Sequence, residues 1–276
     1  MGHEKQYLLY DEDCGLCKWY TATFVKYGFL QKDARLPYHE GIEDQSFDFD
    51  IDRAKNEIAL VSRDTKKVFY GVDSLLHIIG RRWKWMEQVG HFLPIYLFLK
   101  LLYKLISLNR KVISPTVCTT DCDCNPTMSA FWRIAFIVIS GIITGVIVGN
   151  YFVSELGDYL RFHFAYLDML FFVAQIGFQY LFFRLFGQKD FFTYAGHIAV
   201  ISLIGAVVLG IIQIGLNQLG ALGIDIALLQ TAGYGMVLGI MLLEHARRVK
   251  LLGHTKWLTV TWMIFRLLIY PIAFTL

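Results

Sequence analysis

The chain has 276 residues, of which 55% are hydrophobic and 16% aromatic, and its formal net charge at pH 7 is +3. This apolar content exceeds that of an ordinary soluble domain, so at least part of the chain is expected to lie in a membrane. The small net charge argues against a nucleic-acid-binding protein, and no nucleic acid is expected as a partner.

Residues 7–20 read YLLYDEDCGLCKWY and contain a Cys-x-x-Cys pair. Aromatic and branched residues at 7–10 predict a short buried strand, and helical periodicity begins at Cys14 and ends near Gly28. The two thiols are therefore expected at a strand-to-helix junction. Free amide groups in the first turn of a helix stabilise a thiolate, which is the attacking species in disulfide exchange.

The two cysteines are expected to have different roles. Cys14, at the helix start, is the expected nucleophile, and Cys17, one turn further on, is expected to resolve the mixed disulfide. Asp11 and Asp13 disfavour a thiolate at Cys14. Lys18 and the helix end favour it, so the sequence leaves the direction of the pKa shift open. Asp11, at the strand end, is the better placed acid to relay the proton of Cys17.

Residues 1–112 are expected to form one compact α/β domain. Residues 34–38 predict a second strand, at the sheet edge because Pro37 lacks an amide donor. Residues 57–61 and 67–70 predict a β-hairpin, and residues 71–79 predict a helix. An amphipathic helix follows over residues 83–110, or two helices joined near Pro94. Its apolar face is expected to close the core; the alternative is that it also lies on a membrane surface.

The pattern Tyr10-Asp11-x-x-Cys14-x-x-Cys17, followed by a mixed α/β segment, resembles the DCC family of thiol-disulfide oxidoreductase-like proteins, which is named for Asp-x-x-Cys-x-x-Cys. The likeness covers the N-terminal domain and includes the hairpin, the helix start at Gly71 and the Asn109-Arg110 pair. It implies a thioredoxin-like fold and a dithiol–disulfide exchange reaction. The chain departs from the family at Glu12, where glycine is common.

Residues 113–130 are interpreted as a linker that contains three further cysteines, Cys118, Cys122 and Cys124. A Cys-x-x-Cys pair is also half of a zinc site, and these cysteines are the candidates for the other half. Nothing in the sequence brings them to Cys14, so the redox interpretation is preferred to a metal site and to an inert remnant of a redox fold, and neither a metal nor a cofactor is expected. The linker cysteines are alternatively candidates for disulfide exchange with Cys14.

Five apolar segments approach the ~20 residues needed to cross a bilayer and predict an all-α transmembrane bundle over residues 131–276. They are residues 131–153, 164–183, 194–216, 226–243 and 257–276. Gly141, Gly145 and Gly149 recur every fourth residue in the first segment. The smooth face that they form is expected to pack closely, either against a neighbouring span or against a second copy of the chain.

Basic residues follow the second and fourth predicted spans and are scarce after the first and third. By the positive-inside rule, this alternation places residues 1–130 in the cytosol and the C-terminus outside. A cytosolic address also agrees with cysteines that stay reduced or cycle. The polar residues at 1–5 and the early Asp11 do not fit a signal peptide.

Ionisable residues within predicted spans are costly and are therefore candidates for function. They are Asp168, His197, Glu244, His245 and Arg266. Arg266 alone lies clearly inside a span, and a structural pairing with Glu244 or Asp168 is preferred to a transport site.

The sequence therefore predicts a membrane-anchored enzyme that exchanges thiols and disulfides of protein substrates at the cytosolic face, through Cys14, Cys17 and Asp11. The alternative is a membrane transporter or channel-like subunit whose cytosolic domain senses redox state or binds a metal. All five cysteines precede the first predicted span, so the chain alone is not expected to carry reducing equivalents across the membrane by thiol exchange.

Overall fold

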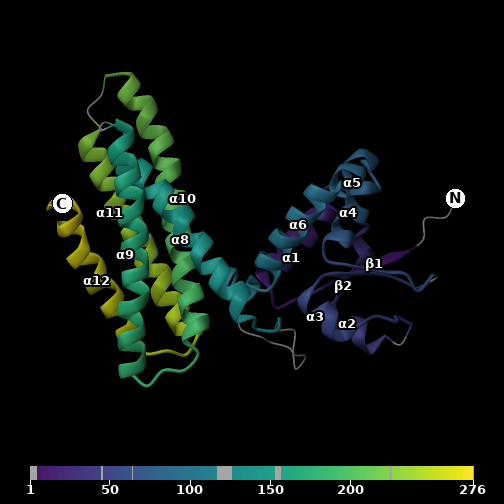
Figure 1. The fold of residues 1–276 in the computed structure, drawn as a ribbon. Helices are drawn as coiled ribbons and strands as arrows, with labels where there is room; N and C mark the ends of the chain where they lie inside the picture. Colours follow the sequence, from purple (N-terminus) through teal and green to yellow (C-terminus); the bar gives the residue numbers. More distant parts are fainter. Residues whose placement is uncertain are drawn as a thin grey trace. The chain divides into compact units, whose positions relative to one another are not determined.

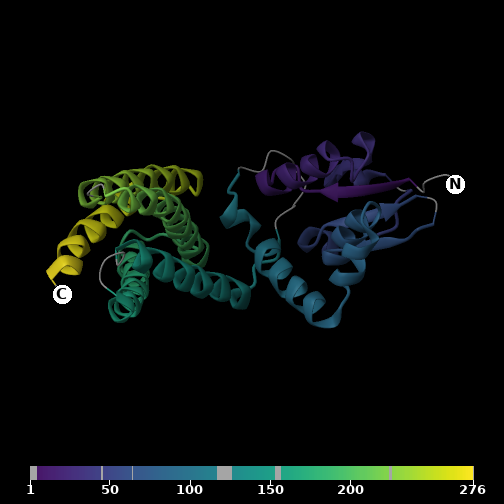
Figure 2. The ribbon, with the colours of Figure 1, turned by 90° about the horizontal axis from the view of Figure 1, so that it is seen from above.

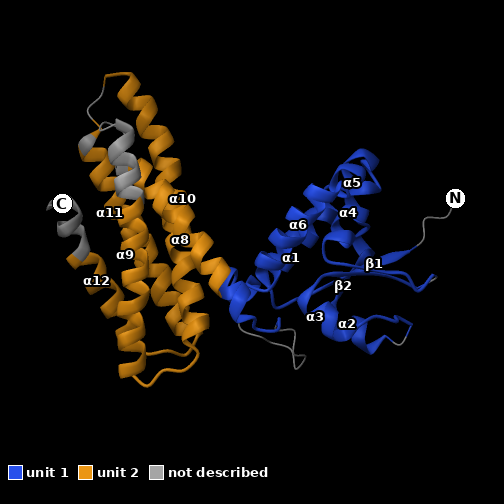
Figure 3. Cartoon of the chain, viewed as in Figure 1, with its two compact units in different colours: residues 1–133 blue, residues 134–276 orange. Residues whose placement is uncertain are grey.

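The computed structural model describes residues 5–44, 46–63, 65–116, 126–152, 157–223 and 226–275. The chain divides into two compact units, the N-terminal unit Met1–Arg133 and the C-terminal unit Ile134–Leu276, which Figure 3 colours separately. Each unit contains hydrophobic clusters of its own buried residues.

The N-terminal unit contains a four-stranded mixed sheet in the order β2-β1-β3-β4 (Figure 1). Its strands are β1 Gln6–Tyr10, β2 Arg35–Pro37, β3 Ala59–Ser62 and β4 Val68–Tyr70. Strand β1 pairs in parallel with β2 and antiparallel with β3, which in turn pairs antiparallel with β4. The predicted edge position of the second strand and the predicted hairpin are both confirmed.

Helices cover both faces of this sheet. They are α1 Gly15–Lys26, α2 Tyr38–Glu43, α3 Ile51–Asn56, α4 Val72–Gly80, α5 Lys84–Gly90, α6 Leu93–Ser107 and α7 Arg110–Ile113, with a short 3₁₀ turn at Lys32–Ala34. Because side chains alternate along a strand, Leu8 faces a cluster with Tyr20 of α1 and Tyr103 of α6. Its neighbour Leu9 faces the opposite cluster, which includes Ala54 of α3.

The long helix predicted over residues 83–110 is broken into α5, α6 and α7. Helices α5 and α6 meet at an angle of 84°, and the elbow is visible in Figure 2. Pro94 lies in the first turn of α6, where a missing amide hydrogen costs nothing because that group has no partner within the helix. The predicted break near Pro94 is therefore confirmed.

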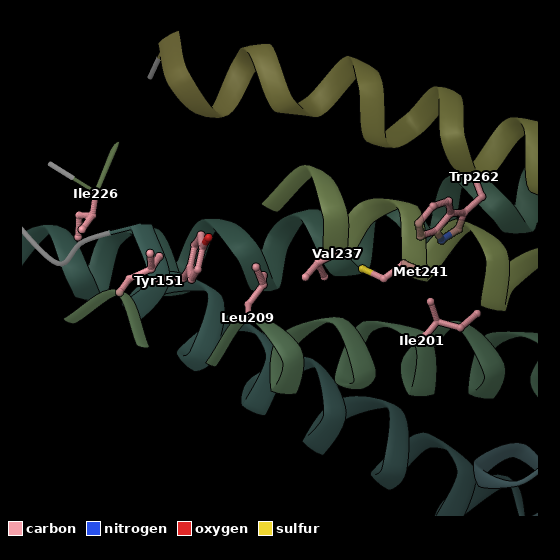
Figure 4. Packing of buried hydrophobic residues seen from close by; sticks show 8 residues of the cluster. Tyr151, Ile201, Leu209, Ile226, Val237, Met241 and Trp262 are labelled. Atoms are coloured by element: carbon pink, nitrogen blue, oxygen red, sulfur yellow. The ribbon is translucent and has the colours of Figure 1, made fainter. Parts of the chain in front are cut away.

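The C-terminal unit consists of long helices. They are α8 Ala130–Phe152, which begins in the N-terminal unit, α9 Gly157–Leu185, α10 Phe191–Ala221, α11 Ala227–Leu251 and α12 Trp257–Thr275. Figure 4 shows how side chains from four of these helices meet in a buried cluster, with Tyr151, Leu209, Met241 and Trp262 among its members. The cluster packs the helices directly against one another.

Three helices are long and apolar enough to cross a membrane within the described part of the chain: Ala130–Tyr151, Tyr166–Leu185 and Phe191–Ala221. The bent pair α5 and α6 is a fourth candidate if it counts as one broken span. The sequence predicts five spans, and the last two correspond to α11 and α12. The described side chains of α12 extend from Trp257 to Leu268 and are mostly apolar, and α11 ends in a charged turn. The structure thus supports three of the five predicted spans on length and composition.

The glycine stripe of α8 is buried at Gly141, Gly145 and Gly149 within the single chain. A Cβ atom added to Gly141 would lie 2.8 Å from the Phe172 side chain of α9. The close approach needs glycine there, and it is made by a neighbouring helix of the same chain.

Glu244 of α11 pairs with arginines of its own helix. Glu244 accepts hydrogen bonds from Arg247 at 2.6 and 2.7 Å and from Arg248 at 2.7 Å. The Arg266 guanidinium lies 5.3 Å from the ring centre of Trp262. The expected pairing of Arg266 with Glu244 is not formed, because Glu244 pairs with two arginines one helical turn further along its own helix. The other expected partner, Asp168 of α9, interacts electrostatically with Arg266.

Candidate active site

Strand β1 and helix α1 bring the two cysteines to a tight turn. The Asp11 carbonyl accepts a hydrogen bond from the Cys14 amide at 3.2 Å, and Cys14 is the N-cap residue of α1. Its sulfur accepts a hydrogen bond from the Cys17 amide at 3.5 Å. Neither cysteine forms a disulfide in this structure. The predicted strand-to-helix junction is confirmed, with one sulfur at the first free amides of the helix.

The two thiols have opposite pKa shifts. A hydrogen bond from Cys17 lowers the pKa of Cys14 to about 6, and the Cys17 amide and the charge of Arg110 act in the same direction. Burial and the charge of Asp11 oppose this shift without reversing it. The same thiol–thiol hydrogen bond, together with burial, raises the pKa of Cys17 well above its ordinary value. The sequence leaves the shift of Cys14 open, and here the stabilising contacts prevail.

The cation that favours the thiolate is Arg110, at the start of α7, whereas Lys18 is exposed on α1. Arg110 Nη2 lies 3.3 Å from Asp11 Oδ2, and Lys111 Nζ lies 3.4 Å from the same oxygen. The other carboxylate oxygen of Asp11 accepts the Asp13 amide at 3.0 Å. Asp11 and Arg110 are each 6% exposed, so this is a buried ion pair beside the thiols.

Sequence reasoning missed Arg110 and Lys111 as partners of Asp11. The Asn109-Arg110 pair appears only as part of the family resemblance, without a role. Arg110 lies 99 positions from Asp11, and the two meet only when α7 docks against the end of β1. The one available signal was a pair of adjacent basic residues at the end of an otherwise apolar helical segment.

The chain segment after α7 covers the cysteine turn. The Thr116 hydroxyl donates a hydrogen bond to the Asp13 carbonyl. Ser114 Oγ lies only 2.6 Å from the position that a Cβ atom would take on Gly15, so this close approach depends on glycine. Cys14 is 0% exposed and Cys17 is 6% exposed. The dithiol is therefore closed to solvent in this structure.

A cavity of about 270 Å³ borders Cys17. Its walls are mostly apolar and come from α1 and α6, with Leu16, Trp19, Phe24 and Ile106 among them. Asp11, Cys17 and Arg110 are among its polar lining residues, together with Lys55 and Ser107. The resolving cysteine proposed from the sequence thus lies between an apolar space and the buried ion pair.

Cys118, Cys122 and Cys124 lie outside the described residues, so their exchange with Cys14 stays a prediction. Among the described residues, no three His, Cys, Asp or Glu side chains are grouped as they would be around a metal ion.

The buried polar side chains of the C-terminal unit form a second network. Tyr194 donates a hydrogen bond to Gln179 Oε1 at 2.9 Å and lies 3.0 Å from His245 Nε2. His245 Nδ1 lies 3.1 Å from Thr259 Oγ1, and His197 Nδ1 lies 2.9 Å from Arg248. These contacts link α9, α10, α11 and α12. Such bonds are typical of helix packing in membranes and provide no thiol chemistry.

Comparison with protein families supports the reading of the N-terminal unit. Residues 8–115 match the DCC1-like thiol-disulfide oxidoreductase family. The match begins within β1, includes both cysteines, the rest of the sheet, Arg110 and Ser114, and ends one residue before Thr116. No curated protein and no solved structure shows significant similarity to the chain. Residues 8–115 therefore form a domain of the DCC1-like thiol-disulfide oxidoreductase family, which this chain joins to helices long and apolar enough to span a membrane.

Proposed function

We propose that the chain is a membrane-anchored thiol-disulfide oxidoreductase that acts at the cytosolic face through Cys14 and Cys17. The observation that carries this function is the hydrogen-bonded thiol pair, in which the pKa of Cys14 is lowered and that of Cys17 is raised. A pair with these opposite shifts holds one thiolate ready to attack and one thiol in reserve near neutral pH.

The reaction starts when the Cys14 thiolate attacks one sulfur of a substrate disulfide. A mixed disulfide forms, and the first substrate thiolate leaves and takes up a proton. Cys17 then loses its proton and attacks the Cys14 sulfur, which releases the second substrate thiol. The substrate gains two electrons, and the protein is left with a Cys14–Cys17 disulfide. A dithiol reductant of the cytosol reverses these steps on the protein and completes the cycle.

Asp11 is proposed to take up the proton of Cys17. Its charge acts on both thiols, and its carboxylate is buried at the end of β1. Arg110 and Lys111 hold this carboxylate in place and are positioning residues in this mechanism. A carboxylate fixed beside a buried thiol is a suitable proton acceptor because the proton needs to travel only a short distance.

The substrate class is a protein thiol or disulfide. The apolar cavity beside Cys17 favours a disulfide that is flanked by apolar side chains, since such side chains lose contact with water on binding. The transporter alternative has less support, because the buried polar contacts of the C-terminal unit link helices to one another and the described side chains of α12 offer only Arg266 as a charged group.

The decisive experiment compares the reactivity of the two cysteines in the reduced full-length protein. A limiting amount of an alkylating reagent is applied between pH 5 and pH 9, and each cysteine peptide is quantified by mass spectrometry. Labelling of Cys14 is expected first, with a midpoint near its pKa of about 6. Equal labelling of both cysteines, or earlier labelling of Cys17, would overturn the roles.

The cytosolic address is tested separately. Arg184 and Lys189 follow the second predicted span, whereas residues 217–225 after the third contain no lysine or arginine. A membrane-impermeant thiol reagent applied to intact cells should therefore miss all five cysteines and label them after the cells are permeabilised. Labelling from outside would invert the orientation without affecting the chemistry.

A further inference from the structure

Helices α5 and α6 present a surface of exposed apolar side chains, which we call the elbow surface. Its members are each between 52% and 65% exposed: Trp85, Phe92, Leu93, Leu97, Phe98 and Leu101. Leu93, Leu97 and Leu101 recur every fourth residue and therefore lie side by side on α6. Exposed apolar areas of this kind mark contact sites for other molecules.

The opposite side of α6 already closes the core of the N-terminal unit. Tyr96 donates a hydrogen bond to Asp73 Oδ1 at 2.9 Å, and the Tyr103 hydroxyl accepts the Ile58 amide at 2.8 Å. The Ser107 hydroxyl donates to the Asn56 carbonyl. The core therefore accounts for one face of the helix and leaves the elbow surface unexplained.

Positive charges border the elbow surface. Lys100 and Lys104 lie one turn apart on α6, so both are at the same edge of its exposed side, and Lys84 begins α5. The sequence of α6 contains no aspartate or glutamate. The acid of α5, Glu87, is half-buried and lies 3.7 Å from His77. An apolar face edged by lysines is complementary to the apolar interior and negative headgroups of a bilayer.

The geometry argues against a simple membrane crossing. Helices α5 and α6 together have the composition of a candidate span, but they meet at 84° and α6 has only 15 residues. A straight span needs about 20 apolar residues. A bent amphipathic pair of this length instead fits the boundary between headgroups and acyl chains.

We propose that the elbow surface inserts into an anionic lipid bilayer and thereby docks the N-terminal unit on the membrane. A bilayer is expected close to the N-terminal unit, because helices long and apolar enough to span a membrane follow in the same chain. A protein partner or a second copy would also bury the apolar side chains, but it would need acidic residues placed opposite the lysines, whereas anionic headgroups supply negative charge all along the bilayer surface. Docking requires no thiol chemistry, so the docking proposal does not depend on the proposed exchange reaction.

The test uses the full-length protein in nanodiscs, with a photocrosslinking amino acid at one position at a time. Phe98→p-benzoylphenylalanine lies in the elbow surface. Ile51→p-benzoylphenylalanine is the control, because Ile51 is 46% exposed on α3, which packs on the opposite face of the sheet. After irradiation, mass spectrometry identifies each adduct as lipid or protein. Lipid adducts are expected at position 98, more in phosphatidylglycerol than in phosphatidylcholine discs, and not at position 51.

Two results would overturn the docking. One is crosslinking of position 98 to protein, either to a second copy or to the C-terminal helices. The other is lipid labelling at position 98 no stronger than at position 51.

A second variant tests the role of charge without disturbing the core. Lys100→Gln combined with Lys104→Gln should lower the docked-to-undocked ratio in anionic discs by about five-fold for each charge removed. The ratio in zwitterionic discs should not change. An equal loss in both lipids would contradict the electrostatic part of the docking, and unchanged preference for Cys14 in alkylation verifies that the variant is folded.

Discussion

Each unit has, among its described residues, a cluster of one carboxylate with two cations, and the two clusters are built differently. In the C-terminal unit, Glu244 binds Arg247 and Arg248, which follow it within one turn of α11. In the N-terminal unit, Asp11 binds Arg110 and Lys111, which come from a helix 99 positions away. The local cluster is partly exposed through Arg247, whereas the long-range cluster is buried and lies beside two thiols.

The local cluster stabilises one helix, whereas the long-range cluster helps to assemble a site from distant segments. An ion pair between a carboxylate and an arginine one turn apart forms wherever the helix forms. It adds a few tenths of a kcal/mol at most to the stability of the helix. A buried pair forms only when distant segments dock, and it creates a fixed electric field where it lies. The field of Asp11 and Arg110 acts on Cys14 and Cys17, so the site depends on the whole N-terminal unit.

The largest expected effect comes from removing one cation from each cluster, which compares the energies of the Asp11 and Glu244 clusters directly. Arg110→Met should destabilise the N-terminal unit by up to about 3–5 kcal/mol, because it leaves a buried carboxylate with Lys111 as its remaining cation. Arg247→Met should cost about 0–1 kcal/mol, because that arginine is half exposed and Arg248 still binds Glu244. Hydrogen exchange of β1 and of α11 in the full-length protein measures both effects. Equal losses would mean that the two clusters are energetically alike.

A second test addresses the thiol–thiol hydrogen bond. Cys17→Ala removes the donor and should raise the pKa of Cys14 from about 6 towards its ordinary value. The alkylation rate of Cys14 below the new pKa should fall about ten-fold for each unit of the shift. Cys17→Ser keeps a donor of similar size and should shift the pKa less. If both variants shift it equally, the hydrogen bond is not the main cause.

The pH dependence of stability provides a third test. The pKa of Cys14 is lower in the folded protein than in an unfolded chain, so the folded state binds fewer protons between about pH 6 and about pH 8.5. Folding stability of the reduced protein should therefore rise with pH through this window, by at most about 1.4 kcal/mol per pH unit, and decline as pH falls through 6. Cys14→Ser should lack this rise. Thermal unfolding of reduced wild type and variant at several pH values shows the difference.

The smallest expected effect concerns the segment that covers the cysteine turn. Gly15→Ala places a methyl group against Ser114 and should displace the segment, so that Cys14 is alkylated faster. Ser114→Ala removes the clashing oxygen and should restore slow alkylation in the double variant. The coupling between these two neighbours is expected to be about 0.5 kcal/mol or slightly more. Additive effects on the rate would indicate that Ser114 does not cover the turn.

The predictable parts of this fold are those with local causes. Alternation and turn residues predict the β1–α1 junction and the hairpin, and Pro37 places its strand at the sheet edge. The contacts of Arg110 and of Thr116 with the cysteine turn were not predicted, because they join segments about a hundred positions apart in one sequence. Pairings of that kind follow from the docking of whole elements and leave no periodic signal in the sequence. The position of the two thiols at the strand-to-helix junction is thus predictable from the sequence, whereas the charged groups around them are not.

The cover over Cys14 also has a kinetic consequence. Cys14 is fully buried, and residues 114–116 contact its neighbours Asp13 and Gly15. If this segment must leave the turn before a reactant meets the sulfur, the observed rate is the opening equilibrium multiplied by the reactivity of the open state. A low-pKa thiolate left uncovered is readily oxidised by peroxide to sulfenic and then sulfinic acid. The closed segment slows the reaction of Cys14 with peroxide and with every other reactant. A substrate that holds the segment open by binding would escape this restriction, so under the proposed function we expect the cover to make exchange depend on recognition and to protect the resting sulfur from irreversible damage.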